Sequence, residues 1–187
     1  MNDALGERGK ALEDSFFQQK DKVLLEKLRE EYRTQGKRDA LSEVSGIADE
    51  ALLDELIQLQ IEPPTFATFS LLPLIKVAWA DGKVQKAERE AILAAAEQSG
   101  ITKSSAAFEI LDGWMEEPPS NDLYEAWKHY AHTLKSSLGE DQASKLQSNV
   151  LGRAREVAEA AGGFLGFGNK VSDEEAEVLE ELAAAFN

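Results

Sequence analysis

The sequence predicts an all-α protein: one compact helical body with an amphipathic helical extension at its N-terminus. The apolar residues are mostly Ala and Leu, and no run alternates apolar and polar residues for the length of a strand. Gly and Pro residues interrupt the chain at intervals that suit helices. With 187 residues, the chain can bury a sizeable core and form one domain with an appendage.

The charge of the chain is strongly negative, −15, from 35 acidic and 20 basic residues. The acids are spread unevenly, because residues 171–187 contain six of them and no Lys or Arg. Nucleic acid binding needs clustered Lys and Arg to neutralise phosphates, so we expect no nucleic acid partner. Cations or basic protein surfaces suit this composition better.

The composition also indicates a cytoplasmic protein. There is no cysteine, which excludes disulfides and thiolate metal sites. The first residues lack the basic-then-apolar layout of a signal peptide. The longest apolar stretch, residues 66–80, is interrupted by Pro73 and Lys76 and is too short to span a bilayer. We therefore expect no association with a membrane.

Residues 1–62 are expected to form the N-terminal extension. A long amphipathic helix is predicted over residues 4–35, ending in a polar stretch that contains Gly36, and a short acidic helix over 49–60. The long helix could fold back on its own domain, pair with a second copy of the chain to give a homo-oligomer, or bind another protein.

Residues 63–187 are expected to form the body. Helices are predicted over 65–80 with a kink at Pro73, and then over 85–98, 103–116, 120–138, 140–162 and 172–186. Gly and Pro residues mark the boundaries between them. Ser172 followed by Glu175 is typical of a capping box at the start of the last helix.

A short internal repeat links two of these helix starts. Residues 168–179 align with residues 81–92 so that a Lys-Val pair, a Glu four residues after the Val and a second Glu two residues further on coincide. The repeat indicates two related helical units that pack together to bury their apolar faces.

The turn from Asp81 to Glu88 is the candidate site. Its spacing is that of the second half of an EF-hand loop, but apolar Val77 and Trp79 stand where the first ligands should be, so it is no EF-hand. Asp81 and Glu88 could instead converge on a cation. In the alternative, Gly82 adopts a positive φ, Asp81 binds turn amides and Glu88 faces the N-terminus of its own helix, without a ligand.

Further oxygen ligands could come from the C-terminal repeat. Asp173, Glu174 and Glu175 stand together at the start of the last predicted helix. If the two repeats pack together, any of these carboxylates could complete the coordination of a divalent cation.

The sequence Ala78-Trp79-Ala80-Asp81-Gly82-Lys83-Val84, with Glu88 following, resembles the signature of the TerB tellurite-resistance family. The resemblance covers about residues 65–187. That superfamily also includes the N-terminal domain of a membrane-anchored J-domain co-chaperone. The resemblance implies a helical bundle of two pseudo-symmetric halves and a role in tellurite or stress responses.

The resemblance also implies a divalent-cation site, with calcium foremost among the ions. Carried over by position, Asp81 and Glu88 match in the first copy and Glu175 in the second. The second copy has Gly168-Asn169 where the first has Asp81-Gly82, so one carboxylate of the pattern is missing.

Other candidate motifs have ordinary structural interpretations. The glycine-rich segment 162–168 is not followed by the Lys-Ser/Thr of a P-loop, so its Phe and Leu side chains are expected to dock on the core. Glu125, His129 and His132 share one helix face, as a zinc site would require, but on the flank where exposed polar residues are common. The three tryptophans are expected to anchor the core.

The sequence therefore predicts a non-enzymatic, divalent-cation-responsive binding protein of the bacterial cytoplasm, with a stress-related role and a protein partner. No nucleophile–base motif or organic-cofactor motif supports an enzyme. The alternative is a metal-free adaptor that holds a protein partner through its N-terminal helix and acidic surface. A divalent cation that shifts thermal unfolding, with the shift lost in Asp81→Asn, would distinguish the two.

Overall fold

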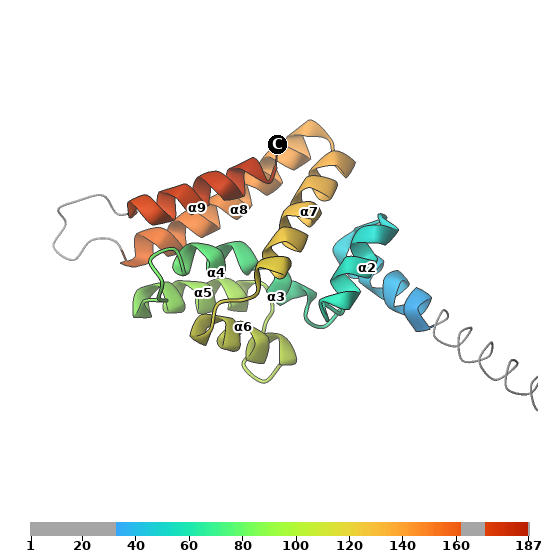
Figure 1. The fold of residues 1–187 in the computed structure, drawn as a ribbon, viewed down its shortest axis with the longest axis horizontal. Helices are drawn as coiled ribbons and strands as arrows, with labels where there is room; N and C mark the ends of the chain where they lie inside the picture. Colours follow the sequence, from blue (N-terminus) through green and yellow to red (C-terminus); the bar gives the residue numbers. More distant parts are fainter. Residues whose placement is uncertain (1–32, 162–170, 187) are drawn as a thin grey trace, which may run out of the picture. The chain divides into compact units, whose positions relative to one another are not determined.

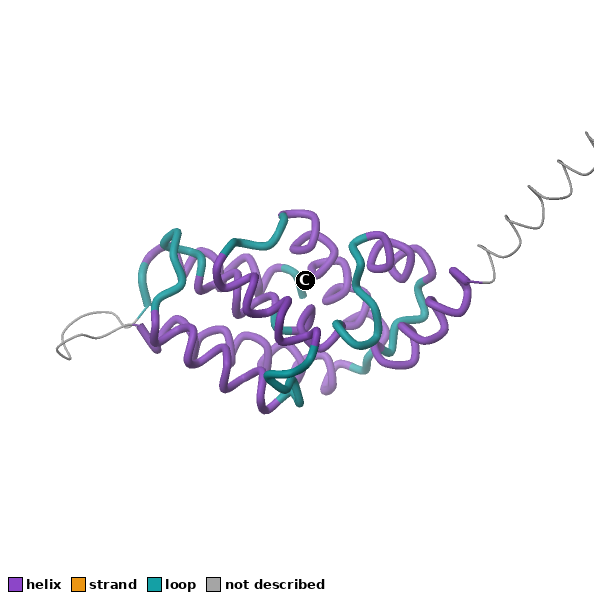
Figure 2. The backbone as a smooth tube through the Cα atoms, turned by 90° about the horizontal axis from the view of Figure 1, so that it is seen from below, coloured by secondary structure: helices purple, strands orange, loops and turns teal. Residues whose placement is uncertain are grey.

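The computed structural model describes residues 33–161 and 171–186. These residues are helical with short connections and contain no strand, as the sequence predicts (Figures 1 and 2). The chain divides into two compact units, residues 1–39 and residues 40–187. The long helix is predicted over residues 4–35, and its part up to residue 32 lies outside the described residues. The predicted docking of the Phe and Leu side chains of 162–168 lies outside them as well. No helix in the described ranges has the length and apolar character needed to cross a membrane.

Residues 33–45 are helical, so the prediction that Gly36 ends a helix is wrong. The helix ends instead before Gly46, which has a φ of 72°, a conformation that glycine adopts without strain. Leu41 is completely buried in the core, and this tertiary contact outweighs the weak helix propensity of glycine. A glycine inside a helix is tolerated where packing on neighbouring residues provides the stability.

Helix α2, Glu50–Gln58, begins at Asp49, whose side chain accepts a hydrogen bond from the backbone N–H of Leu52 at 2.9 Å. Leu52, Leu53 and Leu56 on this helix are buried in the main hydrophobic core. The short acidic helix therefore belongs to the larger unit, which starts at residue 40, whereas the sequence places the boundary near residue 62.

The predicted kinked helix over residues 65–80 is divided into α3, Phe66–Ser70, and α4, Leu72–Ala78. Pro73 lies in the first turn of α4 rather than at a kink. Proline is well suited to the first turn, because the backbone N–H that it lacks has no acceptor within the helix there. The expectation of one helix bent at Pro73 is therefore corrected to two helices that meet at Leu71.

The remaining helices agree closely with the predicted ranges: α5, Lys86–Gln98; α6, Ala106–Glu116; α7, Asn121–Ser137; α8, Glu140–Ala161; α9, Asp173–Ala184. Three of them begin at a serine whose Oγ accepts a backbone N–H: Ser105, Ser120 and Ser172. The cap at Ser105 explains why α6 begins three residues later than the sequence predicts.

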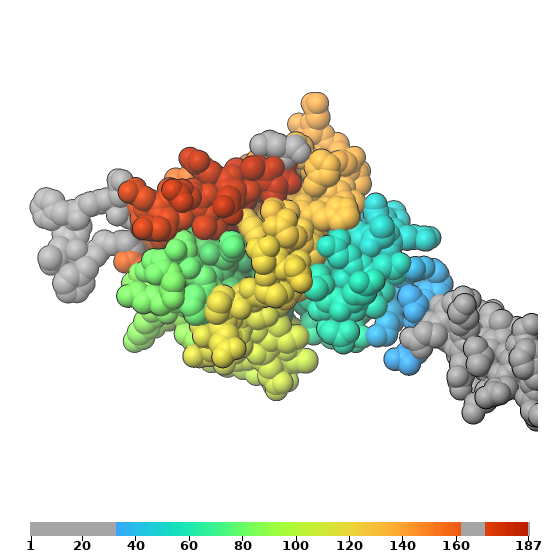
Figure 3. Space-filling model, in the orientation of Figure 1, coloured from blue at the N-terminus to red at the C-terminus, as the bar shows by residue number. Residues whose placement is uncertain are grey.

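Helix α8 is the centre of the larger unit, because it contacts α4, α5, α7 and α9. Figure 1 shows α8 and α9 side by side, with α4 and α5 running next to α8. Figure 3 shows α9 at the molecular surface. Trp127 is buried in the core, and Trp79 donates its indole N–H to the Trp114 carbonyl at 2.8 Å. This packing places the first turns of α5 and α9 within reach of each other.

Candidate functional site: two buried glutamates

The Asp81-Gly82 turn joins α4 to α5, and its geometry follows from two residues. Gly82 has a φ of 87°, in the region that favours glycine. The exposed Asp81 accepts the Lys83 backbone N–H through Oδ1 and the Gln85 side-chain N–H through Oδ2, both at 3.2 Å. Both carboxylate oxygens of Asp81 therefore already hold the turn together.

Glu88 lies in the first turn of α5 and is only 1% exposed. Its Oε2 accepts the backbone N–H of Gln85 at 2.6 Å, the reciprocal bond of a capping box. A carboxylate here also interacts favourably with the positive end of the helix. Local sequence therefore holds this acid at the start of α5, although burial opposes its charge.

Glu175 has the same place at the start of α9 and is 7% exposed. Its Oε2 accepts the backbone N–H of Ser172 at 2.6 Å, and the Ser172 Oγ accepts the Glu175 backbone N–H at 3.1 Å. The predicted capping box at Ser172 is therefore confirmed. The two capping boxes match in the position and hydrogen bonding of the glutamate.

The side chains of Glu88 and Glu175 are both buried, and the Glu175 carboxyl lies close enough to act on the pKa of Glu88. The pKa of Glu88 is raised from 4.5 to about 7. Burial is the largest cause, the backbone N–H of Gln85 lowers the pKa, and the nearby acids Glu175 and Asp81 raise it. Glu88 is therefore a buried acid that keeps its proton up to about pH 7, next to a second buried acid.

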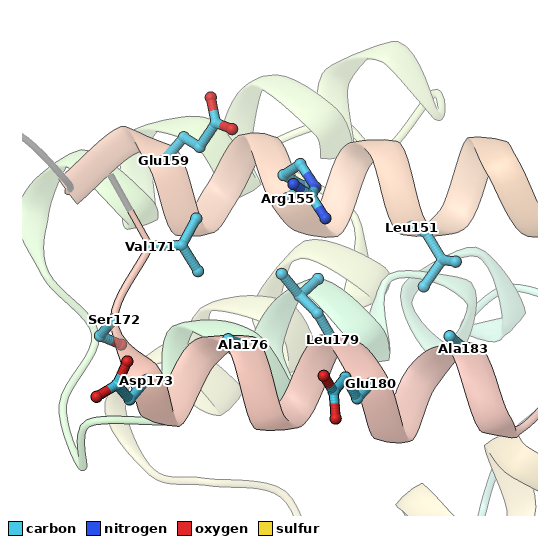
Figure 4. A pocket seen from close by; sticks show the side chains of 10 residues that line it. All are labelled: Leu151, Arg155, Glu159, Val171, Ser172, Asp173, Ala176, Leu179, Glu180 and Ala183. Carbon is cyan, nitrogen blue, oxygen red and sulfur yellow. The ribbon is translucent and has the colours of Figure 1, made fainter. Parts of the chain in front are cut away.

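The other predicted ligands lie at the surface. Asp173 and Glu174 are exposed in the first turn of α9. Asp173 lies at the rim of a groove of about 500 Å³ between α8 and α9, where Figure 4 shows Leu151, Val171 and Leu179 directed toward the space between the two helices. The structure thus brings Glu88 and Glu175 together with Asp81 nearby, and leaves Asp173 and Glu174 apart from the pair.

A complete set of metal ligands is not preassembled in the described part of the chain. Across residues 33–161 and 171–186, no three or more His, Asp or Glu side chains are arranged to hold a metal ion. Of the trio weighed for zinc, His129 instead lies 2.9 Å from the Glu55 carboxylate on α2. The arrangement at Glu88 and Glu175 can hold a proton, or exchange it for a cation whose remaining ligands come from water.

Sequence reasoning missed the contact between the two glutamates and the role of Gln85. Glu88 fits the acidic position of a capping box, three residues after the N-cap, although Gln85 is not the Ser or Thr with which that pattern usually begins. The sequence also gave no sign that Arg89 joins α5 to α6 through Asp112 at 2.6 Å and Glu116 at 2.8 Å. Glu88 and Arg89 both lie in α5, the helix that follows the candidate turn.

In comparisons with known proteins, the chain matches no family model, no curated protein and no solved structure. Its most unusual chemical feature is the pair formed by Glu88 and Glu175, in which two acids are withdrawn from water within a protein of charge −15.

Proposed function

We propose that this chain is a non-enzymatic binding protein of the bacterial cytoplasm whose helical body responds to a divalent cation, with calcium as the first ion to test. The observation that supports the proposal is the buried contact between Glu88 and Glu175. Every side chain whose charge shifts the pKa of Glu88 is itself an acid. A divalent cation would supply the positive charge that this pair lacks.

The donor chemistry suits a hard cation such as calcium, which prefers carboxylate, carbonyl and water oxygens. Glu88 and Glu175 each use Oε2 on a backbone amide, which leaves the Oε1 atoms for a shared partner. In the proposal these two atoms hold the ion, and Asp81, whose charge already acts on Glu88, assists from the turn. Asp173 and Glu174, exposed at the start of α9, would tune the local charge.

The proposal extends to a TerB-like bundle of two related halves with a role in stress responses. It is supported by the matching capping boxes at Glu88 and Glu175, each four residues after a Lys-Val pair. An ion held between the first turns of α5 and α9 would tie the two related halves together and change the surface offered to a protein partner.

Thermal unfolding of the metal-stripped full chain, with and without calcium, tests the proposal. At a hundredfold excess over its dissociation constant, a bound ion adds about 2.7 kcal/mol to the free energy of unfolding, which is about 5–10 °C in Tm at this chain length. We expect the shift to be lost in Glu88→Gln and Glu175→Gln and reduced in Asp81→Asn. Asp173→Asn is the matched control, because it removes one acid outside the pair.

The second candidate function is a metal-free adaptor, and the exposed acids of α9 favour it. Five acidic residues of this helix are exposed: Asp173, Glu174, Glu177, Glu180 and Glu181. Such a face suits a basic protein partner. A Tm that stays constant with calcium, magnesium, manganese and zinc would replace the cation proposal with this one.

A further inference from the structure

A second cavity lies between α4, the start of α7 and α9; neither Glu88 nor Glu175 lines it, but Ala80 and Gly82 of the candidate turn form part of its wall. Its volume is about 510 Å³, within the range of small-molecule sites. Its wall is largely aromatic and aliphatic: Leu72, Trp79, Pro118, Pro119, Tyr124 and Val178. An apolar lining of this kind favours an apolar group of a ligand, because binding removes both surfaces from water.

Tyr124, in the wall of this cavity, carries the one buried side-chain polar atom among the described residues that has no hydrogen-bond partner. The residue is only 4% exposed. Burial and the charges of Glu181 and Glu125 hold the pKa of Tyr124 well above its usual range, so the hydroxyl keeps its proton. The hydroxyl has almost no accessible surface, so Tyr124 lines the cavity with other atoms of its side chain and not with this donor.

Lys76 supplies positive charge at the same cavity. Its Nζ lies 4.6 Å from the centre of the Tyr124 ring, and no carboxylate of the described residues forms an ion pair with it. Ser120 and Asn121, at the positive end of the 17-residue helix α7, also line the cavity. An ammonium group, a helix N-terminus and the polar side chains of Ser120 and Asn121 therefore lie at one largely apolar cavity in a protein of charge −15.

We propose that this cavity binds a small monocarboxylic acid with an apolar group, the carboxylate facing Lys76 and the start of α7 and the apolar group lying against Trp79 and Leu72. A carboxylate is the ligand group that matches this set, because it offers acceptors to the start of α7 and a negative charge to the Lys76 ammonium. The proposal does not depend on a cation at Glu88 and Glu175.

The test uses 4-phenylbutyrate as the probe and the full-length chain in metal-free buffer. NMR titration follows the indole N–H of Trp79, assigned with Trp79→Phe, and we expect saturable shifts with a Kd of about 0.05–1 mM. Lys76→Met keeps most of the aliphatic stem and removes the charge, so it should weaken binding about tenfold or more. The native chain should bind the uncharged analogue 4-phenyl-1-butanol more weakly than 4-phenylbutyrate, by a factor similar to that expected for Lys76→Met.

Lys128→Met is the matched control. Lys128 also lies over the Tyr124 ring, 5.3 Å from its centre, but it pairs with Glu125 at 2.7 Å and does not line this cavity. Its affinity for the probe should stay within about twofold of the native chain. Absence of saturable shifts at about 10 mM probe, or equal affinities in Lys76→Met and the native chain, would overturn the proposal.

Discussion

Glu88 is subject to two opposing electrostatic effects. The start of α5 and the backbone N–H of Gln85 favour its charged form, whereas burial and the charges of Glu175 and Asp81 favour the protonated form. The second set is stronger, because the pKa of Glu88 is raised from 4.5 to about 7. The free energy of unfolding must therefore depend on pH through this one side chain.

The direction of that dependence follows from the raised pKa. Between about pH 4.5 and about pH 7 the folded state holds more protons at Glu88 than the unfolded state does, so stability falls as the pH rises and levels off above. We expect Glu88→Gln, which carries no charge, to be more stable than the native chain by about 1–3 kcal/mol near pH 8 without metal. Urea unfolding across this pH range measures the difference.

The matched control for the pH profile is Glu90→Gln, two residues along the same helix, where the side chain is 67% exposed. The free energy of unfolding of Glu90→Gln should change with pH in the same way as that of the native chain. If the free energies of unfolding of the native chain and of Glu88→Gln changed in parallel from pH 5 to pH 8, Glu88 would not be the source of the pH dependence.

The buried hydroxyl of Tyr124 gives a second prediction for a single residue. Because this hydroxyl has no partner in the described structure, Tyr124→Phe should leave the free energy of unfolding unchanged or raise it by about 1 kcal/mol. Tyr124→Leu, which loses the packing of the aromatic ring on Trp127, should lower it by about 2 kcal/mol. Chemical denaturation of both variants decides the point; a clear loss in Tyr124→Phe would show that the hydroxyl is bonded.

Glycine has opposite effects on stability in a turn and in the interior of a helix. Gly82, with a φ of 87°, connects α4 and α5, whereas Gly152 lies within α8. An added Cβ would meet no atom within 4 Å at either position, so only the backbone conformation distinguishes them. Gly82→Ala should lower stability by about 1 kcal/mol, and Gly152→Ala should raise it by about 0.5–1 kcal/mol. Thermal or urea unfolding of the two variants would contradict this if both changed stability in the same direction.

Local patterns predicted most elements because capping is a local interaction. Asp49, Ser172 and the positive φ of Gly82 could be read from neighbouring residues alone. Gly36 and Pro73 were misjudged, because the effect of each depends on where it falls within a packed helix. Propensity is a weak guide where tertiary contacts decide the boundary.

At the scale of the whole molecule, the packing around α8 creates the candidate site. The sequence could predict that Glu88 and Glu175 each lie in the first turn of a helix, from their spacing to Gln85 and Ser172. It could not predict that the two side chains touch, because that depends on how α4 and α8 position α5 and α9. The burial of the pair, and hence the raised pKa of Glu88, follows from this packing.

The pair also couples parts of the chain that are distant in sequence. A proton or a cation at Glu88 and Glu175 changes the repulsion between the first turns of α5 and α9, so occupancy should alter how firmly the two helices are held together. This coupling is the central claim of the proposed function, and it requires that an ion bind at the pair itself.

Calorimetric titration of calcium into the metal-stripped full chain near pH 8 tests this claim most directly, because most Glu88 side chains have then lost their proton. We expect one ion to bind each chain, with binding abolished in Glu88→Gln and in Glu175→Gln and retained in Asp173→Asn. Absence of binding heat, or binding that persists unchanged in both glutamine variants, would contradict the account and leave the pair as a proton-linked contact between two helix starts.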